Sequence, residues 1–156
     1  MYHVDFVRER EDVQIPTRGS SEAAGWDLYA WTYDNFTYNE KEEWAVVIPP
    51  KATLKVNTGI YVAIPDGCFG GIYARSGLAT KQGLAPANKV GIIDSDYRGQ
   101  LIVALYNHSD LPVTLHKGDR VAQLIVQPYI RTQLVEVKEL DETERGDGGF
   151  GSTGTN

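Results

Sequence analysis

Short runs of β-branched, aliphatic and aromatic residues recur along the chain, separated by breaks rich in Gly, Pro, Asn and Asp. Such runs fit a pleated, half-buried surface and the break residues form tight turns, so the pattern predicts an all-β fold. Clear strand candidates are GQLIVALYN (99–107) and RVAQLIVQPYI (120–130). Many short strands of this kind are typical of a sandwich, a jelly roll or a barrel.

Two apolar stretches allow more specific expectations. The stretch TLKVNTGIYVAIP (53–65) is interpreted as two strands around a turn at Asn57-Thr58-Gly59. In LIVALY (101–106) both alternating faces are apolar, which indicates a strand covered on both sides. A second sheet or another subunit would provide that cover, and a dimer and a trimer would both satisfy it.

Two other segments depart from the strand pattern. The stretch SGLATKQG (76–83) predicts one short helix, with Ser76 able to cap its start and Gly83 to end it. The aromatic and acidic stretch WTYDNFTYNEKEEW (31–44) has no clean period. We interpret it as a surface excursion, with a hairpin as one possible form.

Composition narrows the class of protein. The chain has 156 residues, which fits one domain with a sizeable core. Its 15 Lys and Arg against 21 Asp and Glu give a net charge of -6, which argues against a general binder of nucleic acids or membrane surfaces. Cys68 is the only cysteine, and no N-terminal apolar run is long enough for a signal or a spanning helix. A reducing compartment such as the cytosol or nucleus is therefore expected.

The metal-ligand inventory points to a hard cation. One Cys and three scattered His leave too few ligands for a zinc site built from nitrogen and sulfur. Carboxylates could still position magnesium through water. Any anionic ligand must be held by a few placed groups, because the chain as a whole is acidic.

The stretch GIIDSDYRG (91–99) contains a candidate general base. It predicts a β-hairpin with its tip near Ser95-Asp96. Asp94 follows apolar Ile93, and partial desolvation would make its carboxylate a better proton acceptor than it is in water. The alternative is that Asp94 and Asp96 only form the turn, and spacing alone favours that alternative.

The stretch YARSGLA (73–79) contains a candidate phosphate site. Arg75 ends a strand-like run, and Ser76 and Gly77 follow at the expected helix start. A guanidinium, a hydroxyl and backbone amides that converge on one point would suit a phosphate oxygen. A helix cap beside an ordinary surface arginine is the alternative, and by itself the simpler one.

Two polar residues interrupt apolar strand candidates. In EAAGWDL (22–28), Asp27 lies between apolar residues, where it could bind metal-bound water or accept from nearby amides. In GDRVAQLIV (118–126), Gln123 lies among hydrophobic residues. Most such glutamines make an internal hydrogen bond, so a ligand contact is the less common outcome.

The apolar pattern stops at about residue 141, and a glycine-rich tail follows that includes RGDGGFGSTG (145–154). Glycine amides, the Ser152 and Thr153 hydroxyls, the Arg145 guanidinium and the flat Phe150 ring would together suit a nucleoside polyphosphate. The alternative is a disordered terminus of low complexity. Neither standard phosphate-binding loop motif is present in the sequence.

In order and spacing, five of these stretches resemble the motifs of the homotrimeric dUTPase family, the deoxyuridine triphosphate nucleotidohydrolases. They are EAAGWDL, ARSGLA, GIIDSDYRG, GDRVAQLI and RGDGGFGSTG. The resemblance implies an all-β jelly roll or distorted β-barrel with one short helix over 1–140, followed by a flexible arm over 141–156. It also implies a homotrimer with exchanged C-terminal arms, each closing a neighbouring active site.

The implied reaction converts dUTP and water to dUMP and pyrophosphate, which limits uracil in DNA and supplies dUMP for thymidylate synthesis. By match to the third motif, Asp94 is the general base that activates water for attack on the α-phosphorus. Tyr97 packs against the deoxyribose and leaves no room for a 2′-hydroxyl. Asn88, Gly91 and the backbone near Ile93 bind the uracil, in a pocket too tight for the methyl group of thymine.

The other matches imply contacts to the triphosphate and to its Mg²⁺. Ser76 and Gly77 resemble residues that contact the phosphate chain, and Gln123 one that holds the α-phosphate region. Arg75 resembles a residue that steadies Asp27 or a neighbouring subunit's site. Asp27 acts on the metal through bound water.

The resemblance gives the tail a function. Phe150 stacks on uracil, and the γ-phosphate is held by Arg145, Gly151, Ser152 and Thr153. Substrate then provides something for the tail to fold around, and closure excludes water from the reaction.

Departures from the family pattern are modest: Trp26 replaces a common tyrosine and Ala74 a common proline. Two alternative functions stay open. A dCTP deaminase on the same fold carries a glutamate on the strand after the hairpin, and QLIVALYN (100–107) has no acidic residue. A non-catalytic nucleotide sensor or interaction protein on the dUTPase scaffold is the other.

Overall fold

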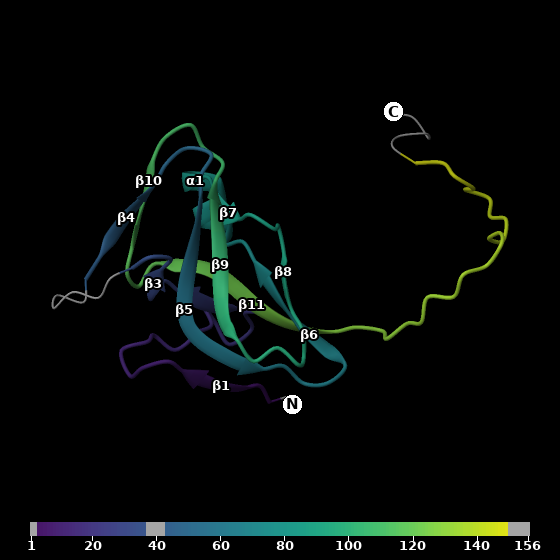
Figure 1. Cartoon of the computed structure of the whole chain (residues 1–156), viewed down its shortest axis with the longest axis horizontal. Coiled ribbons are helices and arrows are strands. Elements are labelled where there is room, and N and C mark those ends of the chain that lie inside the picture. The colour runs from purple at the N-terminus through teal and green to yellow at the C-terminus, as the bar shows by residue number, and fades with distance from the viewer. Residues whose placement is uncertain (1–2, 37–42, 150–156) are drawn as a thin grey trace.

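The computed structural model describes residues 3–36 and 43–149. Within these ranges the chain is mostly β-strand with one short helix, so the expected all-β class is confirmed (Figure 1). The elements are β1 (Asp5–Arg8), β2 (Trp26–Tyr29), β3 (Thr32–Tyr33), β4 (Ala45–Ile48), β5 (Thr53–Ala63), β6 (Cys68–Tyr73), α1 (Ser76–Gln82), β7 (Leu84–Pro86), β8 (Gly91–Ile93), β9 (Gln100–Asn107), β10 (Val113–His116) and β11 (Arg120–Pro128).

The strands form open sheets rather than a closed barrel in the described part of the chain. One sheet has the order β1-β5-β9-β7, with β3 also paired to β5. A four-stranded sheet has the order β2-β11-β6-β8, and β10 pairs with β4 in a two-stranded sheet. All of these ladders are antiparallel. Figure 1 shows the long strands β5 and β9 side by side.

The core lies on one face of β5 and β9 and against β11. Alternate residues of β9, Leu101, Val103 and Leu105, are at most 2% exposed, as the period of a half-buried strand requires. The opposite face of β9 is less covered, and Ile102 is 46% exposed. Among the described residues, no second sheet covers this face of β9, so the cover expected from another subunit stays a prediction.

The expected turn in 53–65 is wrong, because β5 is one continuous strand through this region. Gly59 has a φ of 69°, and the ladder to β9 shifts register between Asn57 and Tyr61. The irregularity is stabilised from outside the segment: Thr58 Oγ1 donates to the Leu101 carbonyl at 2.7 Å. Glycine thus permits a bulge within a strand here rather than a reversal of the chain.

The expected β-hairpin around Ser95-Asp96 is only half right. A turn is present, since the Tyr97 amide donates to the Asp94 carbonyl at 3.1 Å. The strands on either side do not pair with each other: β8 pairs with β6, and β9 pairs with β5 and β7. The turn therefore carries the chain from one sheet to the other.

The helix matches its expected range but not its expected start. The N-cap is Arg75 and makes no side-chain cap hydrogen bond, so Ser76 is the first helical residue rather than the cap. Gly83 ends the helix in the left-handed conformation with a φ of 72°, as expected. At seven residues α1 is short, and the described part of the chain contains no helix long and apolar enough to cross a membrane.

Both ends of the 31–44 segment belong to the core. Trp31 is 8% exposed and Trp44 is 9% exposed, and the Trp44 indole donates to the Trp31 carbonyl at 2.9 Å. Tyr33 packs edge-on against Trp44, with ring centroids 5.0 Å apart. The surface excursion stays a prediction for residues 37–42, which lie outside the described residues.

A carboxylate fixes the N-terminal loop to this aromatic cluster. Asp12 accepts hydrogen bonds from the Trp31 indole at 3.2 Å and from Lys117 Nζ at 3.3 Å. Burial alone would raise the pKa of Asp12, but these donors and the nearby Arg10 outweigh it, so the pKa is lowered below its usual value. The ionised form therefore stabilises the fold at neutral pH.

The chain is exposed after its last strand. That strand ends at Pro128, and the residues from there through Asp147 are exposed. The arm boundary expected at about residue 141 stays a prediction. Figure 1 shows the segment running away from the body. Leu134 is 97% exposed and Leu140 is 83% exposed. The described residues after Pro128 therefore contribute little to the core of the single chain.

Gly59→Ala should destabilise the fold by about 2 to 4 kcal/mol, because a left-handed backbone strains alanine and a tight core resists added volume. A Cβ at Gly59 would lie 2.6 Å from Val13 Cγ2 and 2.9 Å from Trp31 Cε3. Urea unfolding measures the loss. Gly67→Ala is the matched control: its φ is 75°, nothing lies within 4 Å of the added Cβ, and the cost should be about 1 kcal/mol. Equal losses for both variants would contradict the packing argument.

Candidate active site

Four of the five motif stretches gather on the four-stranded sheet. EAAGWDL leads into β2, GDRVAQLI forms much of β11, ARSGLA follows β6 into α1, and GIIDSDYRG contains β8. The ladder places Asp27 opposite Gln123, and Gln123 opposite Tyr73 on its other side. Strand pairing therefore brings together residues that are far apart in the sequence.

Asp27 is held by two arginines. Arg75 Nε donates to Asp27 Oδ1 at 2.8 Å, and Arg120 Nη1 donates to Asp27 Oδ2 at 3.3 Å. The Asp27 side chain is only 13% exposed, and that of Arg75 is 26% exposed. A partly buried pair of this kind is screened less by water than a surface pair, so the carboxylate is fixed in place.

Gln123 makes an internal hydrogen bond next to this ion pair. Its side-chain amide donates to the Ala74 carbonyl at 2.9 Å, immediately before Arg75. A Cβ on Gly25 would lie 2.8 Å from Gln123 Oε1, so the glycine before Trp26 leaves room for the amide. The structure thus shows the internal hydrogen bond that most such glutamines make, and the side chain stays half-buried.

Ser76 and Gly77 lie exposed at the start of α1, directly after Arg75. A Cβ built on Gly77 meets nothing within 4 Å, so the surface beside it is open. The chain itself does not require glycine there. These residues are therefore accessible to solvent next to Arg75 in the sequence.

Asp94 lies in the turn after β8, away from that ion pair. Its side chain is exposed, so the expected partial desolvation is absent in the described chain, where the carboxylate has no side-chain hydrogen-bond partner. Tyr97, in the same turn, is 41% exposed, and its hydroxyl donates to the Gln100 carbonyl at 3.0 Å. Both groups can be reached from solvent.

Asn88 and Gly91 lie side by side at the start of β8. A Cβ on Gly91 would lie 3.3 Å from Asn88 Nδ2 and 3.2 Å from Ile72 Cβ, so glycine lets the amide approach the strand. Asn88 is exposed, and Ile93 is half-buried where it pairs with Gly70. The described chain leaves the Asn88 amide open to a ligand.

The sheet keeps Asp94 and Asp27 apart. Asp27 is on the edge strand β2, and Asp94 directly follows the opposite edge strand β8; these strands are three strand spacings or roughly 14 Å apart. The register of the ladders adds an offset along the strand direction. Asp27 aligns with Tyr73 of β6 through Gln123, whereas Ile93 aligns with Gly70 of β6. Asp94 lies one residue beyond Ile93, on the side away from Tyr73. That offset of four residues is roughly 13 Å. One chain alone does not bring both carboxylates to one phosphate.

Arg145 is not brought to these residues either. Its Nε donates to the Gly148 carbonyl at 2.8 Å in a turn of the arm, which Figure 1 shows leading away from the sheets. Phe150, Gly151, Ser152 and Thr153 lie outside the described residues. The clustering expected for the tail is therefore not tested by the structure.

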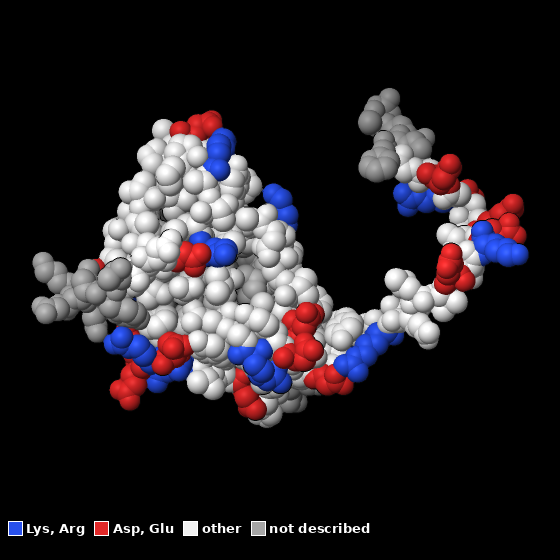
Figure 2. Space-filling view, viewed as in Figure 1, with Lys and Arg blue, Asp and Glu red and all other residues white. Residues whose placement is uncertain are grey.

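The residues present fit a metal carried by the substrate. The described residues contain no group of three or more His, Cys, Asp or Glu side chains that could hold a metal ion. A carboxylate has about four acceptor positions, and the two arginines use two of those of Asp27. Asp27 can therefore still accept from metal-bound water. Figure 2 shows acidic and basic side chains interspersed over the visible face rather than a single basic patch.

Sequence reasoning missed Arg120 and Arg18. Arg120 precedes an apolar strand in a Gly-Asp turn and carries no local sign that its partner is Asp27. Arg18 lies over the Trp26 ring at 4.5 Å from the centroid, a cation–π contact that uses the tryptophan present instead of tyrosine. The Arg120 contact joins residues 93 positions apart, and the Arg18 contact depends on how the loop before β2 folds back on Trp26.

The architecture and this site define an all-β protein with an ion-paired carboxylate on one of its sheets. Comparison with known proteins identifies its family. The sequence model of the dUTPase family matches residues 11–154. The chain therefore belongs to the dUTPase family. Its expected membership, from five motifs in order, is confirmed.

Relatives with a known name align with almost the whole of this chain. The human mitochondrial deoxyuridine 5'-triphosphate nucleotidohydrolase is 44% identical over 151 residues, covering 97% of this chain and 54% of that protein. The chain thus spans about half the length of that relative. The Hydrogenobaculum enzyme of the same name is 43% identical over 145 residues and is covered to 93%, as is this chain.

Solved structures share the fold. A point mutant of the dUTPase of Staphylococcus bacteriophage 80alpha, described with dUpNHpp, has a TM-score of 0.83 at 24% identity, covering 99% of this chain and 100% of that one. A point mutant of the dUTPase from phage phi11 of S. aureus has a TM-score of 0.70 at 24% identity, covering 88% and 98%, and its description names a structural Mg(II) ion.

A double-mutant cycle with Asp27→Asn and Arg75→Gln should give a coupling of about 1 to 3 kcal/mol, because both charges are largely shielded and directly hydrogen-bonded. Urea unfolding of the four proteins measures it. The control cycle uses the exposed pair Lys51 and Asp110, whose nitrogen and oxygen are 3.0 Å apart. That pair should couple more weakly, and a larger coupling there would contradict the role given to burial.

Proposed function

We propose that this chain hydrolyses dUTP to dUMP and pyrophosphate. Family membership and the names of relatives at 43% and 44% identity support this activity. The observation that carries it in the chain itself is the arrangement of the motif residues. A fixed Asp27, Arg75 and Arg120 group lies on one part of the sheet, and an exposed Asp94 lies in a turn on another.

Asp94 is the general base in this proposal. Its carboxylate accepts a proton from water, whose oxygen forms a bond to the α-phosphorus of dUTP. The bond between the α-phosphorus and the bridging oxygen then breaks, and pyrophosphate leaves with that oxygen. The exposed position of Asp94 supports this role, because water and substrate can reach it.

The nucleoside is recognised by the residues around the same turn. The Asn88 amide and the backbone of Gly91 and Ile93 bind the uracil edge, and the space beside Gly91 supports this assignment. Tyr97 packs against the deoxyribose. Its ring is 41% exposed and is oriented by the bond from its hydroxyl to Gln100, so a flat face is available to the sugar.

The triphosphate is bound at the start of α1. The Ser76 hydroxyl and the open surface at Gly77 face the phosphate chain, and Gln123 and Arg75 complete the contact region. Mg²⁺ bound to the triphosphate would neutralise charge that develops on the leaving pyrophosphate. Asp27 would orient water on that ion through its unused acceptor positions.

A homotrimer completes the site in this proposal. The separation of Asp94 from Asp27 within one chain supports a site built from more than one chain. The partly exposed face of β9 around Ile102 and the exposed arm from Pro128 support subunit contacts. The arm would close a neighbouring site, with Phe150 on uracil and the γ-phosphate held by Arg145, Gly151, Ser152 and Thr153.

The two alternative functions gain no support from the fold. The strand after the turn, β9, contains no acidic residue to serve a dCTP deaminase. A nucleotide sensor would not need an exposed carboxylate in the third motif. Cys68 is buried and free, which is compatible with a reducing compartment such as the cytosol or nucleus.

Pyrophosphate release from dUTP should fall about 100- to 10,000-fold in Asp94→Asn, because a general base contributes that much to rate. The assay compares dUTP with the four common dNTPs and UTP. Asp96→Asn is the matched control in the same turn and should retain most activity. A wild-type protein that binds dUTP but releases no pyrophosphate would instead support the sensor.

Removal of residues 145–156 should leave a folded chain whose turnover collapses. The described part of this segment is mostly exposed and adds little to the core, so the melting temperature should hardly change. Pyrophosphate release and thermal unfolding are the two measurements. A chain that ends at Gly154 keeps the whole fifth motif and is the control. Loss of the fold in the shorter chain would contradict the assignment of this segment as an arm.

A further inference from the structure

We propose that Arg98 is a positioning residue that holds the turn carrying Asp94, an inference that rests on the proposed function. Asp94 needs a defined direction to aim water at phosphorus, but its own carboxylate has no side-chain partner in the described chain. Its place is therefore set by the backbone of the turn. Arg98 is the side chain that fixes this backbone.

The geometry of the guanidinium supports this role. Arg98 Nη1 donates to the Ser95 carbonyl at 2.8 Å and to the Tyr97 carbonyl at 3.0 Å. This nitrogen carries two hydrogens, so it can serve both carbonyls at once. The turn also has its own backbone bond from the Tyr97 amide to the Asp94 carbonyl at 3.1 Å. Together these bonds restrain each peptide between the proposed base and the sugar-binding ring.

The next residue explains how Tyr97 is kept in the same arrangement. A Cβ on Gly99 would lie 2.3 Å from the Tyr97 hydroxyl oxygen and 2.5 Å from its ring carbon Cζ. The ring therefore folds back over Gly99, where its hydroxyl donates to the Gln100 carbonyl at 3.0 Å. Arg98 thus holds the backbone around Tyr97 through hydrogen bonds, and the missing side chain of Gly99 leaves space for the Tyr97 ring.

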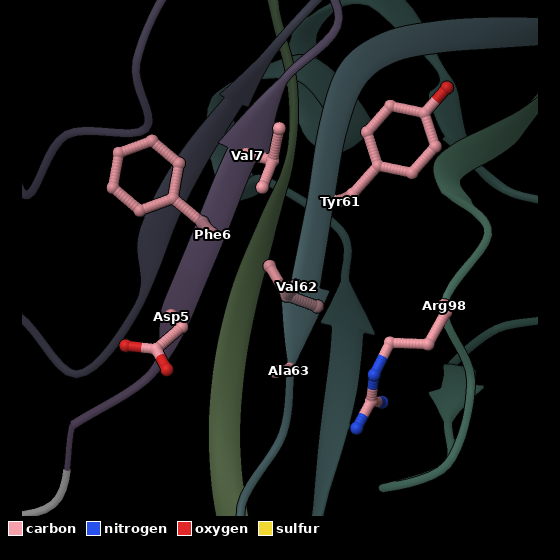
Figure 3. A pocket seen from close by; sticks show the side chains of 7 residues that line it. All are labelled: Asp5, Phe6, Val7, Tyr61, Val62, Ala63 and Arg98. Atoms are coloured by element: carbon pink, nitrogen blue, oxygen red, sulfur yellow. The ribbon is translucent and has the colours of Figure 1, made fainter.

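Arg98 also lies next to the neighbouring sheet. Arg98 lines a cavity of about 300 Å³ together with residues of β1 and of β5, among them Tyr61, Val62 and Ala63. Figure 3 shows the Arg98 side chain reaching from the loop toward the cavity beside β5. Open space lies beside the Arg98 side chain, and its hydrogen bonds to Ser95 and Tyr97 lie within the turn.

Arg98 acts through the backbone rather than on the nucleotide. Its bonds to Ser95 and Tyr97 occupy the donor atom that faces the turn. Loss of these bonds should loosen the direction of the Asp94 carboxylate while the phosphate-binding residues on the other strands stay in place. The effect should therefore fall on kcat more than on nucleotide binding.

The test compares wild type, Arg98→Met and Arg98→Lys. Methionine keeps an apolar stem and removes the donors, and lysine can reach one carbonyl more readily than both. In Arg98→Met we expect kcat for dUTP to fall about 10- to 100-fold, the scale of a small misplacement of a catalytic group. The Kd for dUpNHpp and the melting temperature should stay close to wild type. Arg98→Lys should be intermediate in kcat.

Arg131→Met is the matched control, since Arg131 pairs with Asp66 at the surface outside the motifs. A wild-type kcat in Arg98→Met would overturn the proposal, and so would an equal loss of dUpNHpp affinity. If Arg98→Met does not fold, a wild-type kcat in Arg98→Lys would overturn it instead. A wild-type chain that does not hydrolyse dUTP would contradict the proposed function. An active wild type with an equally active Arg98→Met variant would contradict only the role of Arg98.

Discussion

An ion-paired carboxylate joins three segments that lie far apart in the sequence. Asp27 on β2 accepts from Arg75, at the start of α1, and from Arg120, at the start of β11. Most of the side chain is shielded from water, so removing both guanidinium groups would leave a poorly solvated, unpaired charge. The neighbouring bond from Gln123 to Ala74 depends on the same strand alignment. The strand alignment therefore determines where the Asp27 ion pair and the Gln123 amide lie.

The same strand alignment also keeps Asp27 and Asp94 apart within a single chain. A sheet of fixed strand order places β2 and β8 on opposite edges, and the register carries Asp94 further from Asp27. The strands cannot bend enough to bring the two carboxylates together without breaking the ladders between them. The ion-paired group on β2 and its separation from Asp94 are thus two results of one topology, and the proposed assembly from several chains follows from the second.

Sequence pattern predicted the features that depend on near neighbours. The apolar runs of β9 and β11 and the end of α1 at Gly83 are local signals, and the structure has them. The bulge at Gly59 was mistaken for a turn because its stabilising partner, the Leu101 carbonyl, comes from another strand. Arg120 was missed because its partner Asp27 is 93 positions away. Residue identity alone does not encode such pairings.

The distance between Asp94 and Asp27 has a genetic consequence under the proposed assembly. A cell that makes two versions of the chain would build mixed trimers, and a damaged copy would impair sites to which healthy copies also contribute. Two alleles with different defects, one at Asp27 and one at Asp94, would conversely restore some intact sites in the mixture. Dominance and complementation between alleles would thus follow from the strand order of one sheet.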